Sequence, residues 1–284
     1  MRYESPTTVE AAVALLGAGN ARVLAGGTDL IVQYRSGRIA PDVVVDIKHI
    51  DATRKISEEN GGYRIGAAVS GAEINENAAL CKAWPGVTEA TDLIGSTQIQ
   101  GRASLGGNLC NASPAADTVP ALIAANAVCT VAGPNGTREV PVEKIPAGPG
   151  KTSLAAGEFV VSLTLPKRPA HSGDAYLRFI PRTEMDIAVV GAGVNLVLDA
   201  SGTVTDARVA VGAVAPTALL VPDAGKALVG SKLEQDALDK MAAAVRAVCK
   251  PINDKRGTIE YRTKVAGVMA QRAAKIAYER ARSN

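Results

Sequence analysis

Two glycine-rich segments carry the residue types that bind phosphate groups. They are Ala25-Gly26-Gly27-Thr28-Asp29-Leu30, directly after Leu24, and Ser104-Leu105-Gly106-Gly107-Asn108. Adjacent glycines allow positive φ angles, and their N–H groups can approach an anion without a Cβ in the way. The hydroxyls of Thr28 and Ser104 can donate to phosphate oxygens, and the Asn108 amide can both donate and accept. Two such loops could hold a pyrophosphate between them.

Two other nucleotide-binding patterns are incomplete. Gly150-Lys151-Thr152 resembles the end of a phosphate-binding P-loop, but Ile145 stands where the leading glycine is required. Gly191-Ala192-Gly193 lacks the third glycine of a dinucleotide fingerprint, because Leu196 occupies that position. We therefore expect neither a P-loop nor a Rossmann domain.

The sequence indicates no catalytic pair and no metal site. The four cysteines, Cys81, Cys110, Cys129 and Cys249, show no spacing typical of zinc or iron–sulfur ligands. His49 and His171 have no serine or cysteine partner in a recognisable setting. Any redox chemistry would then depend on a bound cofactor.

The first 55 residues predict an alternating unit that places the first glycine segment between a strand and a helix. Thr7-Thr8-Val9-Glu10 reads as a capping box for a helix that ends at Gly17. A strand over Arg22–Leu24, a helix over Leu30–Arg35 and a buried strand over Val43–Ile47 follow. A turn that leads into a helix offers free N–H groups to an anion.

The next region, residues 56–166, contains the second glycine segment. The sequence predicts helices after Ser70, over Pro85–Ile94 and from Ser113-Pro114. It predicts strands over Tyr63–Ala67, Val128–Ala132, Arg138–Val142 and Glu158–Leu165. A linker is expected at Pro166–Asp174.

The remaining residues predict long strands followed by helices. The strands are expected over Ile187–Leu198 and Val204–Val214, and Ser231-Lys232-Leu233-Glu234 and Thr258 are expected to begin the two helices. The fold class is therefore α+β.

Composition limits the functional classes. Hydrophobic residues make up 47% of the 284 residues and charged residues 21%, a balance typical of a globular protein. A net charge of +3 and 3% aromatic residues argue against a nucleic-acid-binding protein. We find no signal peptide and no apolar run that could span a membrane, so we expect a cytoplasmic protein.

The second glycine segment, with its flanks, resembles a known family. It reads Ile99-Gln100-Gly101-Arg102-Ala103-Ser104-Leu105-Gly106-Gly107-Asn108 and then Ala112-Ser113-Pro114-Ala115-Ala116-Asp117. This is similar to the FAD-binding medium subunit of molybdenum hydroxylases, the xanthine dehydrogenase and carbon monoxide dehydrogenase family. The resemblance implies a FAD-binding domain of the vanillyl-alcohol-oxidase (PCMH) type at 1–170, with subdomains 1–55 and 56–170. A C-terminal domain at 171–284, with a three-stranded antiparallel sheet and helices, should follow.

The resemblance also implies the site residues. The segments from Leu24 to Leu30 and from Ser104 to Asn108 would hold the pyrophosphate, Ile94 would be an apolar cofactor contact, and Asp117 would contact the adenosine half. The segment Phe179–Ala188 resembles the family's strand beside the flavin. Thr28-Asp29 stands where carbon monoxide dehydrogenases carry His-Ser, which argues against carbon monoxide as substrate.

By resemblance, the chain would carry electrons as part of a complex. A large subunit with a molybdopterin cofactor would oxidise the substrate, and a small [2Fe–2S] subunit would pass electrons to the FAD, in a dimer of heterotrimers. Two alternatives stay open: a self-contained flavin reductase or oxidase on the same fold, and an assembly scaffold without flavin. The final acceptor could be a quinone, NAD or oxygen.

Overall fold

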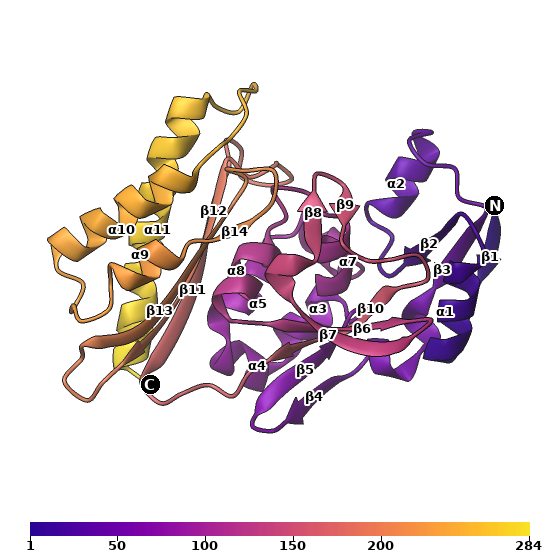
Figure 1. Ribbon diagram of the computed structural model, residues 1–284, viewed down its shortest axis with the longest axis horizontal. Coiled ribbons are helices and arrows are strands. Elements are labelled where there is room, and N and C mark those ends of the chain that lie inside the picture. Colours follow the sequence, from indigo (N-terminus) through magenta and orange to yellow (C-terminus); the bar gives the residue numbers. More distant parts are fainter.

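The computed structural model describes residues 1–284, in three parts that follow one another along the chain (Figure 1). The first part is a parallel sheet of three strands in the order β1-β3-β2. Its elements are β1 (Arg2–Glu4), α1 (Val9–Gly17), β2 (Ala21–Leu24), α2 (Leu30–Arg35) and β3 (Val43–Asp46). The first glycine segment thus joins the carboxyl end of β2 to α2, as the sequence predicts.

The second part is an antiparallel sheet of five strands in the order β4-β5-β10-β6-β7, with helices on one side. Its strands are β4 (Ile56–Glu59), β5 (Gly62–Gly66), β6 (Val128–Gly133), β7 (Gly136–Pro141) and β10 (Phe159–Leu165). Its helices are α3 (Gly71–Glu76), α4 (Ala78–Ala83), α5 (Pro85–Asp92), α6 (Thr97–Gln100), α7 (Leu105–Cys110) and α8 (Thr118–Ala124). A small hairpin of β8 (Pro146–Gly148) and β9 (Lys151–Thr152) precedes β10.

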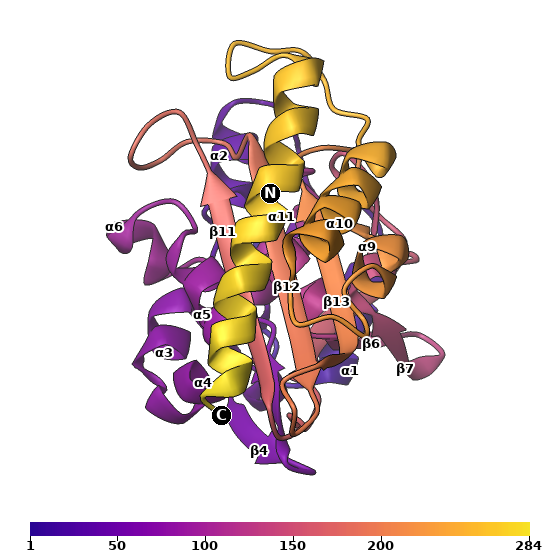
Figure 2. The same ribbon diagram turned by 90° about the vertical axis from the view of Figure 1, so that its left-hand side faces the viewer.

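The third part is an antiparallel sheet with helices on one face (Figure 2). The sheet has four strands and not the predicted three, because the short strand Leu219–Leu220 pairs with Ala210 and Val211 at its edge. Its elements are β11 (Ser172–Phe179), β12 (Val190–Leu198), β13 (Val204–Gly212), β14 (Leu219–Leu220), α9 (Pro222–Lys226), α10 (Gln235–Val248) and α11 (Ile259–Arg282). The helix α11 lies along β11 and β12. Its buried face consists mostly of alanines, and Gly173 in β11 has no Cβ, so helix and sheet approach closely.

The opposite face of this sheet packs against α8 of the second part. A Cβ at Gly193 would lie 2.5 Å from the carbonyl oxygen of Pro120, and one at Gly212 would lie 2.8 Å from the Pro120 ring. Such distances are below van der Waals contact, so these positions admit only glycine without displacement of α8. The Gly191-Ala192-Gly193 run therefore serves close packing and not dinucleotide binding.

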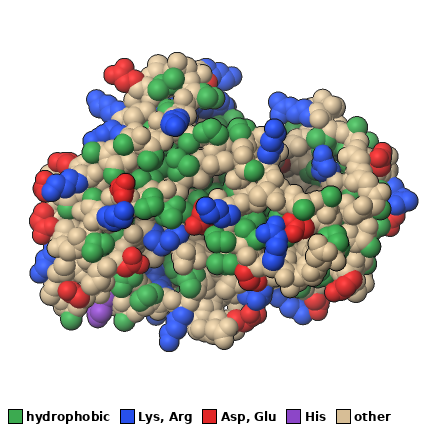
Figure 3. Space-filling view, in the orientation of Figure 1, with side chains coloured by type: hydrophobic (Ala, Val, Ile, Leu, Met, Phe, Trp, Pro, Cys, Tyr) green, Lys and Arg blue, Asp and Glu red, His purple; other side chains and the backbone are tan.

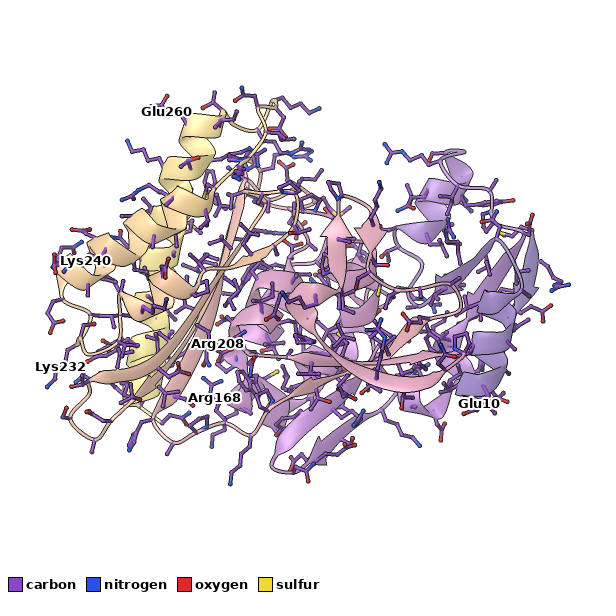
Figure 4. The ribbon with its side chains drawn as sticks, viewed as in Figure 1. Glu10, Arg168, Arg208, Lys232, Lys240 and Glu260 are labelled. Carbon is purple, nitrogen blue, oxygen red and sulfur yellow. The ribbon has the colours of Figure 1, made fainter.

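Two arginines also tie the second and third parts together (Figure 4). Arg208 of β13 donates to the carbonyl oxygen of Ile123 at 3.0 and 3.1 Å. Arg168, which precedes β11, binds the Asp174 carboxylate at 2.6 Å and lies 4.6 Å from the centre of the Trp84 ring. The predicted domain boundary near residue 170 lies beside this contact, between β10 and β11.

Helix starts differ from the sequence predictions in three places. The first helix is capped by Thr8, whose hydroxyl accepts from Ala11 N at 3.2 Å, so the capping box predicted from Thr7 does not form. The helix predicted at Ser113-Pro114 begins at Thr118, because the Ser113 hydroxyl accepts from Ala115 N and holds a turn there. The helix predicted from Ser231 begins at Gln235, after Leu233 in a left-handed conformation.

The resemblance implies a strand over Phe179–Ala188, but only Phe179 belongs to one. β11 ends at Phe179, and the residues that follow form a loop. Met185 has a φ of 52°, which a strand does not accommodate. Arg182 and Arg256 both bind the Asp186 carboxylate and hold the loop in this shape.

Candidate cofactor-binding cleft

A cleft of about 550 Å³ lies between the first and second parts of the chain. Its walls include both glycine segments, although some 75 residues separate them in the sequence. In Figure 3 the lobe that carries α2 stands apart from the central part of the molecule across a notch in the upper outline. A volume of this size is typical of a cofactor or ligand site.

The first glycine segment presents a run of unpaired donors. The N–H groups of residues 26–30 have no hydrogen-bond acceptor within the chain. Gly27 has a φ of 78°, and a Cβ at Gly26 would lie 1.8 Å from the carbonyl oxygen of Arg102. The first glycine allows this contact between the two walls, and the second allows the turn. Several N–H groups in one turn form an anion-binding concavity.

The second glycine segment has a different conformation from the one that its sequence predicts. Gly106 and Gly107 belong to the short helix α7 and do not have positive φ. The Ser104 hydroxyl accepts from Gly107 N at 3.1 Å and caps this helix, which leaves the hydroxyl hydrogen available to a ligand. A Cβ at Gly106 would lie 2.6 Å from the Ala67 carbonyl oxygen, whereas one at Gly107 would meet only the Ser104 hydroxyl. Gly107 thus keeps space open in the cleft, and Gly106 allows close packing.

Asn108 is oriented by a partner from α8. Its side-chain oxygen accepts from the Thr118 N–H at 3.1 Å and from the Thr118 hydroxyl at 2.7 Å. The amide nitrogen of Asn108 is therefore left as the donor at the cleft wall.

Eleven of the fourteen predicted site residues line the cleft: Ala25, Gly26, Gly27, Thr28, Asp29, Leu30, Ile94, Ser104, Gly106, Gly107 and Asn108. Leu24 and Leu105 do not; Leu105 is fully buried in the core. The surrounding protein raises the pKa of the Asp29 carboxyl by desolvation.

Asp117 lies outside the cleft wall, near the third part of the chain. Its carboxylate is 3.2 Å from the guanidinium of Arg178, which also donates to the carbonyl oxygen of Leu93. Burial raises the pKa of Asp117 to about 6, although Arg178 acts in the opposite direction. The structure thus pairs Asp117 with β11 rather than with the glycine segments.

Sequence reasoning missed several residues at the cleft. Gln33 of α2 donates to the side-chain oxygen of Asn111 at 2.9 Å, which joins the two walls. Cys110 and the segment 154–160 also line the cavity. Asn111 follows the second glycine segment directly, but nothing in the sequence connects it with Gln33.

Two family models match the chain. "FAD binding domain in molybdopterin dehydrogenase" covers residues 1–168, and "CO dehydrogenase flavoprotein C-terminal domain" covers residues 175–277. The chain is 34% identical to the carbon monoxide dehydrogenase medium chain of Afipia carboxidovorans, over 99% of this chain and 98% of the relative. The chain belongs to the FAD-binding medium subunits of the molybdenum hydroxylase family. It is therefore an oxidoreductase subunit.

The chain is also similar to another curated relative and to solved structures along nearly its whole length. The putative xanthine dehydrogenase FAD-binding subunit of Escherichia coli K12 is 29% identical, over 95% of this chain and 93% of its own length. A solved Cu,Mo-CO dehydrogenase chain matches with a TM-score of 0.95 at 34% identity, over 99% of this chain and 98% of that chain. Quinoline 2-oxidoreductase from Pseudomonas putida 86, at 24% identity and a TM-score of 0.90 over 99% of this chain and 98% of that chain, shares the fold.

The residues of the cleft fit the FAD that a medium subunit of this family binds. FAD carries a negatively charged pyrophosphate between its two halves, and the free N–H groups of residues 26–30 are suited to it. No three His, Cys, Asp or Glu side chains gather where they could hold a metal ion. None of the helices is both long enough and apolar enough to span a lipid bilayer.

Proposed function

We propose that this medium subunit carries electrons from [2Fe–2S] clusters on a partner subunit, through its FAD, to an external acceptor. The observation that carries the proposal is the match of both family models across nearly the whole chain, together with a cleft of unpaired N–H donors in the FAD-binding domain. When bound, FAD supplies the redox chemistry, and the chain's residues bind and orient it.

The proposed partners are a large subunit with a molybdenum cofactor and a small [2Fe–2S] subunit, in a dimer of heterotrimers in the cytoplasm. Relatives support an assembly: one is named a subunit of the 6-hydroxypseudooxynicotine dehydrogenase complex of Paenarthrobacter nicotinovorans. A similar solved structure is that of a carbon monoxide dehydrogenase from Hydrogenophaga pseudoflava, which lacks the Mo-pyranopterin moiety of its molybdenum cofactor.

For the cofactor contacts we propose two groups of residues. The N–H groups of Gly26 to Leu30, with the Thr28 hydroxyl, would bind one side of the pyrophosphate. The Ser104 hydroxyl and the Asn108 amide would donate from the other side, and Ile94 would add an apolar contact. A contact of Asp117 with the adenosine half stays a prediction, because its carboxylate is paired with Arg178 outside the cleft.

Reconstitution tests the proposed function. The full-length chain should bind FAD without a covalent bond, so acid precipitation should release all of the flavin. Dithionite should reduce this FAD, whereas hydroxylase substrates should reduce it only after both partner subunits are added. Omission of the [2Fe–2S] subunit should again prevent reduction. If the chain alone turned over an organic substrate, the proposal would be wrong, and the chain would be a self-contained flavin reductase or oxidase.

A further inference from the structure

A chain of three side chains ends at the first glycine segment. The Tyr3 hydroxyl donates to the Asp46 carboxylate at 2.6 Å, and the Lys48 ammonium lies 2.7 Å from the other oxygen of that carboxylate. The same ammonium donates to the carbonyl oxygen of Ala25 at 2.8 Å. The Asp46 side chain is 5% exposed and the Lys48 side chain 20%, so little water competes for these bonds.

The bond from Lys48 fixes the orientation of one peptide group. In a trans peptide the C=O of one residue and the N–H of the next point in opposite directions. The Ala25 carbonyl is turned toward Lys48, which is not part of the cleft wall, so the Gly26 N–H is turned the other way. This N–H is the first of the unpaired donors in residues 26–30.

Asp46 holds Lys48 in place from two directions. Its Oδ1 accepts from the Lys48 backbone N–H at 2.9 Å as well as from the ammonium. Burial raises the pKa of Asp46, but the hydrogen bonds from Lys48 and Tyr3 outweigh burial, and the pKa lies below its ordinary value. The carboxylate is therefore charged at neutral pH and keeps the ammonium beside Ala25.

We propose that Lys48, held by Asp46 and Tyr3, is a positioning residue that presents the Gly26 N–H to the pyrophosphate of FAD. Without the ammonium, the peptide group between Ala25 and Gly26 can rotate and turn a carbonyl oxygen toward the phosphate. The Lys48 charge, close to the same loop, also offsets part of the phosphate charge. This inference rests on FAD being the cofactor of the cleft.

Lys48→Met in the full-length chain tests the inference, with Lys55→Met as the matched control. Lys55 is a nearby lysine whose ammonium pairs only with the exposed Asp51. We expect Lys48→Met to weaken FAD binding by about 10- to 100-fold, because this is the change in dissociation constant that loss of a hydrogen bond to a charged group produces. Lys55→Met should bind FAD like the wild type. Quenching of flavin fluorescence in a titration measures both dissociation constants.

Two further measurements separate positioning from general stability. The melting temperature of flavin-free Lys48→Met should stay close to that of the flavin-free wild type, while the increase on addition of FAD becomes smaller. Lys48→Arg should recover most of the affinity, because it restores a charged donor. Tyr3→Phe, which folds with both charged partners present, should weaken FAD binding by a few-fold.

The outcomes distinguish this inference from the proposed function. A wild-type chain that does not bind FAD would contradict the proposed function itself. A wild type that binds FAD, with a Lys48→Met variant that binds it equally well, would overturn only the role of Lys48. If Lys48→Met does not fold, FAD binding by Tyr3→Phe decides the question: wild-type affinity in this variant would overturn the inference.

Discussion

The glycines that line the cleft have different structural roles, although their sequence contexts are similar. Gly26 allows contact with the Arg102 carbonyl oxygen and Gly27 allows a left-handed turn, whereas Gly107 is helical and borders open space. The sequence predicts two equivalent phosphate loops. The structure contains one loop of free N–H groups and one helix start that contributes side chains.

We predict that Gly107→Val lowers FAD occupancy to less than about a tenth of the wild-type value while the chain stays folded. The added side chain would occupy the cleft, since only the Ser104 hydroxyl lies near the position of its Cβ. This costs at least about 1.4 kcal/mol of binding free energy. Flavin absorbance per protein and circular dichroism measure the two effects.

Gly101→Val is the matched control for this variant. Gly101 follows α6 at the surface, and the nearest atom to a Cβ there is 4.0 Å away. Full flavin content in Gly107→Val would show that this helix start does not contact the cofactor.

Asp117 leads to a prediction about pH. Its pKa rises from 3.8 to about 6 in the folded chain, so the folded state binds a proton that the unfolded state has released between these values. Between pH 4 and pH 6 this group therefore lowers the stability of the wild type as pH rises. Asp117→Asn removes the effect, because an amide does not titrate.

The measurement is the free energy of unfolding in urea. The wild type should gain roughly 1–3 kcal/mol relative to Asp117→Asn when the pH is lowered from 7 to 4. A constant difference between the two proteins across this range would contradict the raised pKa.

At the scale of elements, α2 is held loosely. None of its residues is buried, and one side-chain hydrogen bond, from Gln33 to Asn111, joins it to the opposite wall of the cleft. Elements with few buried contacts open at low free energy. Two residues of α2, Leu30 and Gln33, line the cleft.

We predict that Gln33→Ala accelerates FAD release by a few-fold, because it removes the one bond from α2 across the cleft. Stopped-flow flavin fluorescence measures the rate after dilution. Gln98→Ala, at an exposed position of α6, is the control. Equal release rates in the two variants would show that α2 does not limit release.

Some elements around the cleft can be predicted from the sequence, and others cannot. The helix of α2 and the strands β2 and β10 follow from apolar spacing, and the sequence predicts all three. α7 was missed because Leu105-Gly106-Gly107-Asn108 has low helix propensity, and only contact with Ala67 and the Ser104 cap make it helical. The contact between Asp117 and Arg178 was missed for another reason: it depends on the packing of two parts that are distant in sequence.

At the scale of the whole molecule, the interface between α8 and the sheet of the third part, here called the seam, fixes how the two domains are arranged. Glycines in β12 and β13 let the sheet approach Pro120, and Arg168 and Arg208 add polar contacts at its edges. A large glycine-lined contact of this kind favours a fixed arrangement of the two parts. The FAD-binding domain and the C-terminal domain should therefore move as one unit.

We predict that Gly193→Val lowers the melting temperature by roughly 5 °C or more, because its Cβ would overlap the Pro120 backbone. It should also increase proteolysis within 166–171, the segment that connects the two parts. Thr205→Val, at an exposed position of β13, is the control for a valine in the same sheet. Melting at the wild-type temperature would mean that the seam tolerates displacement.

The position of β10 in the middle sheet has a consequence for biosynthesis. β10 pairs with both β5 and β6, and Val161 accepts from Ala67 N at 2.9 Å, next to the second wall of the cleft. A ribosome releases both glycine segments long before it releases residues 159–165. Nascent chains that end before β10 contain both glycine segments but lack the central strand between β5 and β6 and part of the cleft lining. We therefore expect flavin to bind only after β10 has emerged, and chains arrested before β10 should leave the ribosome without flavin.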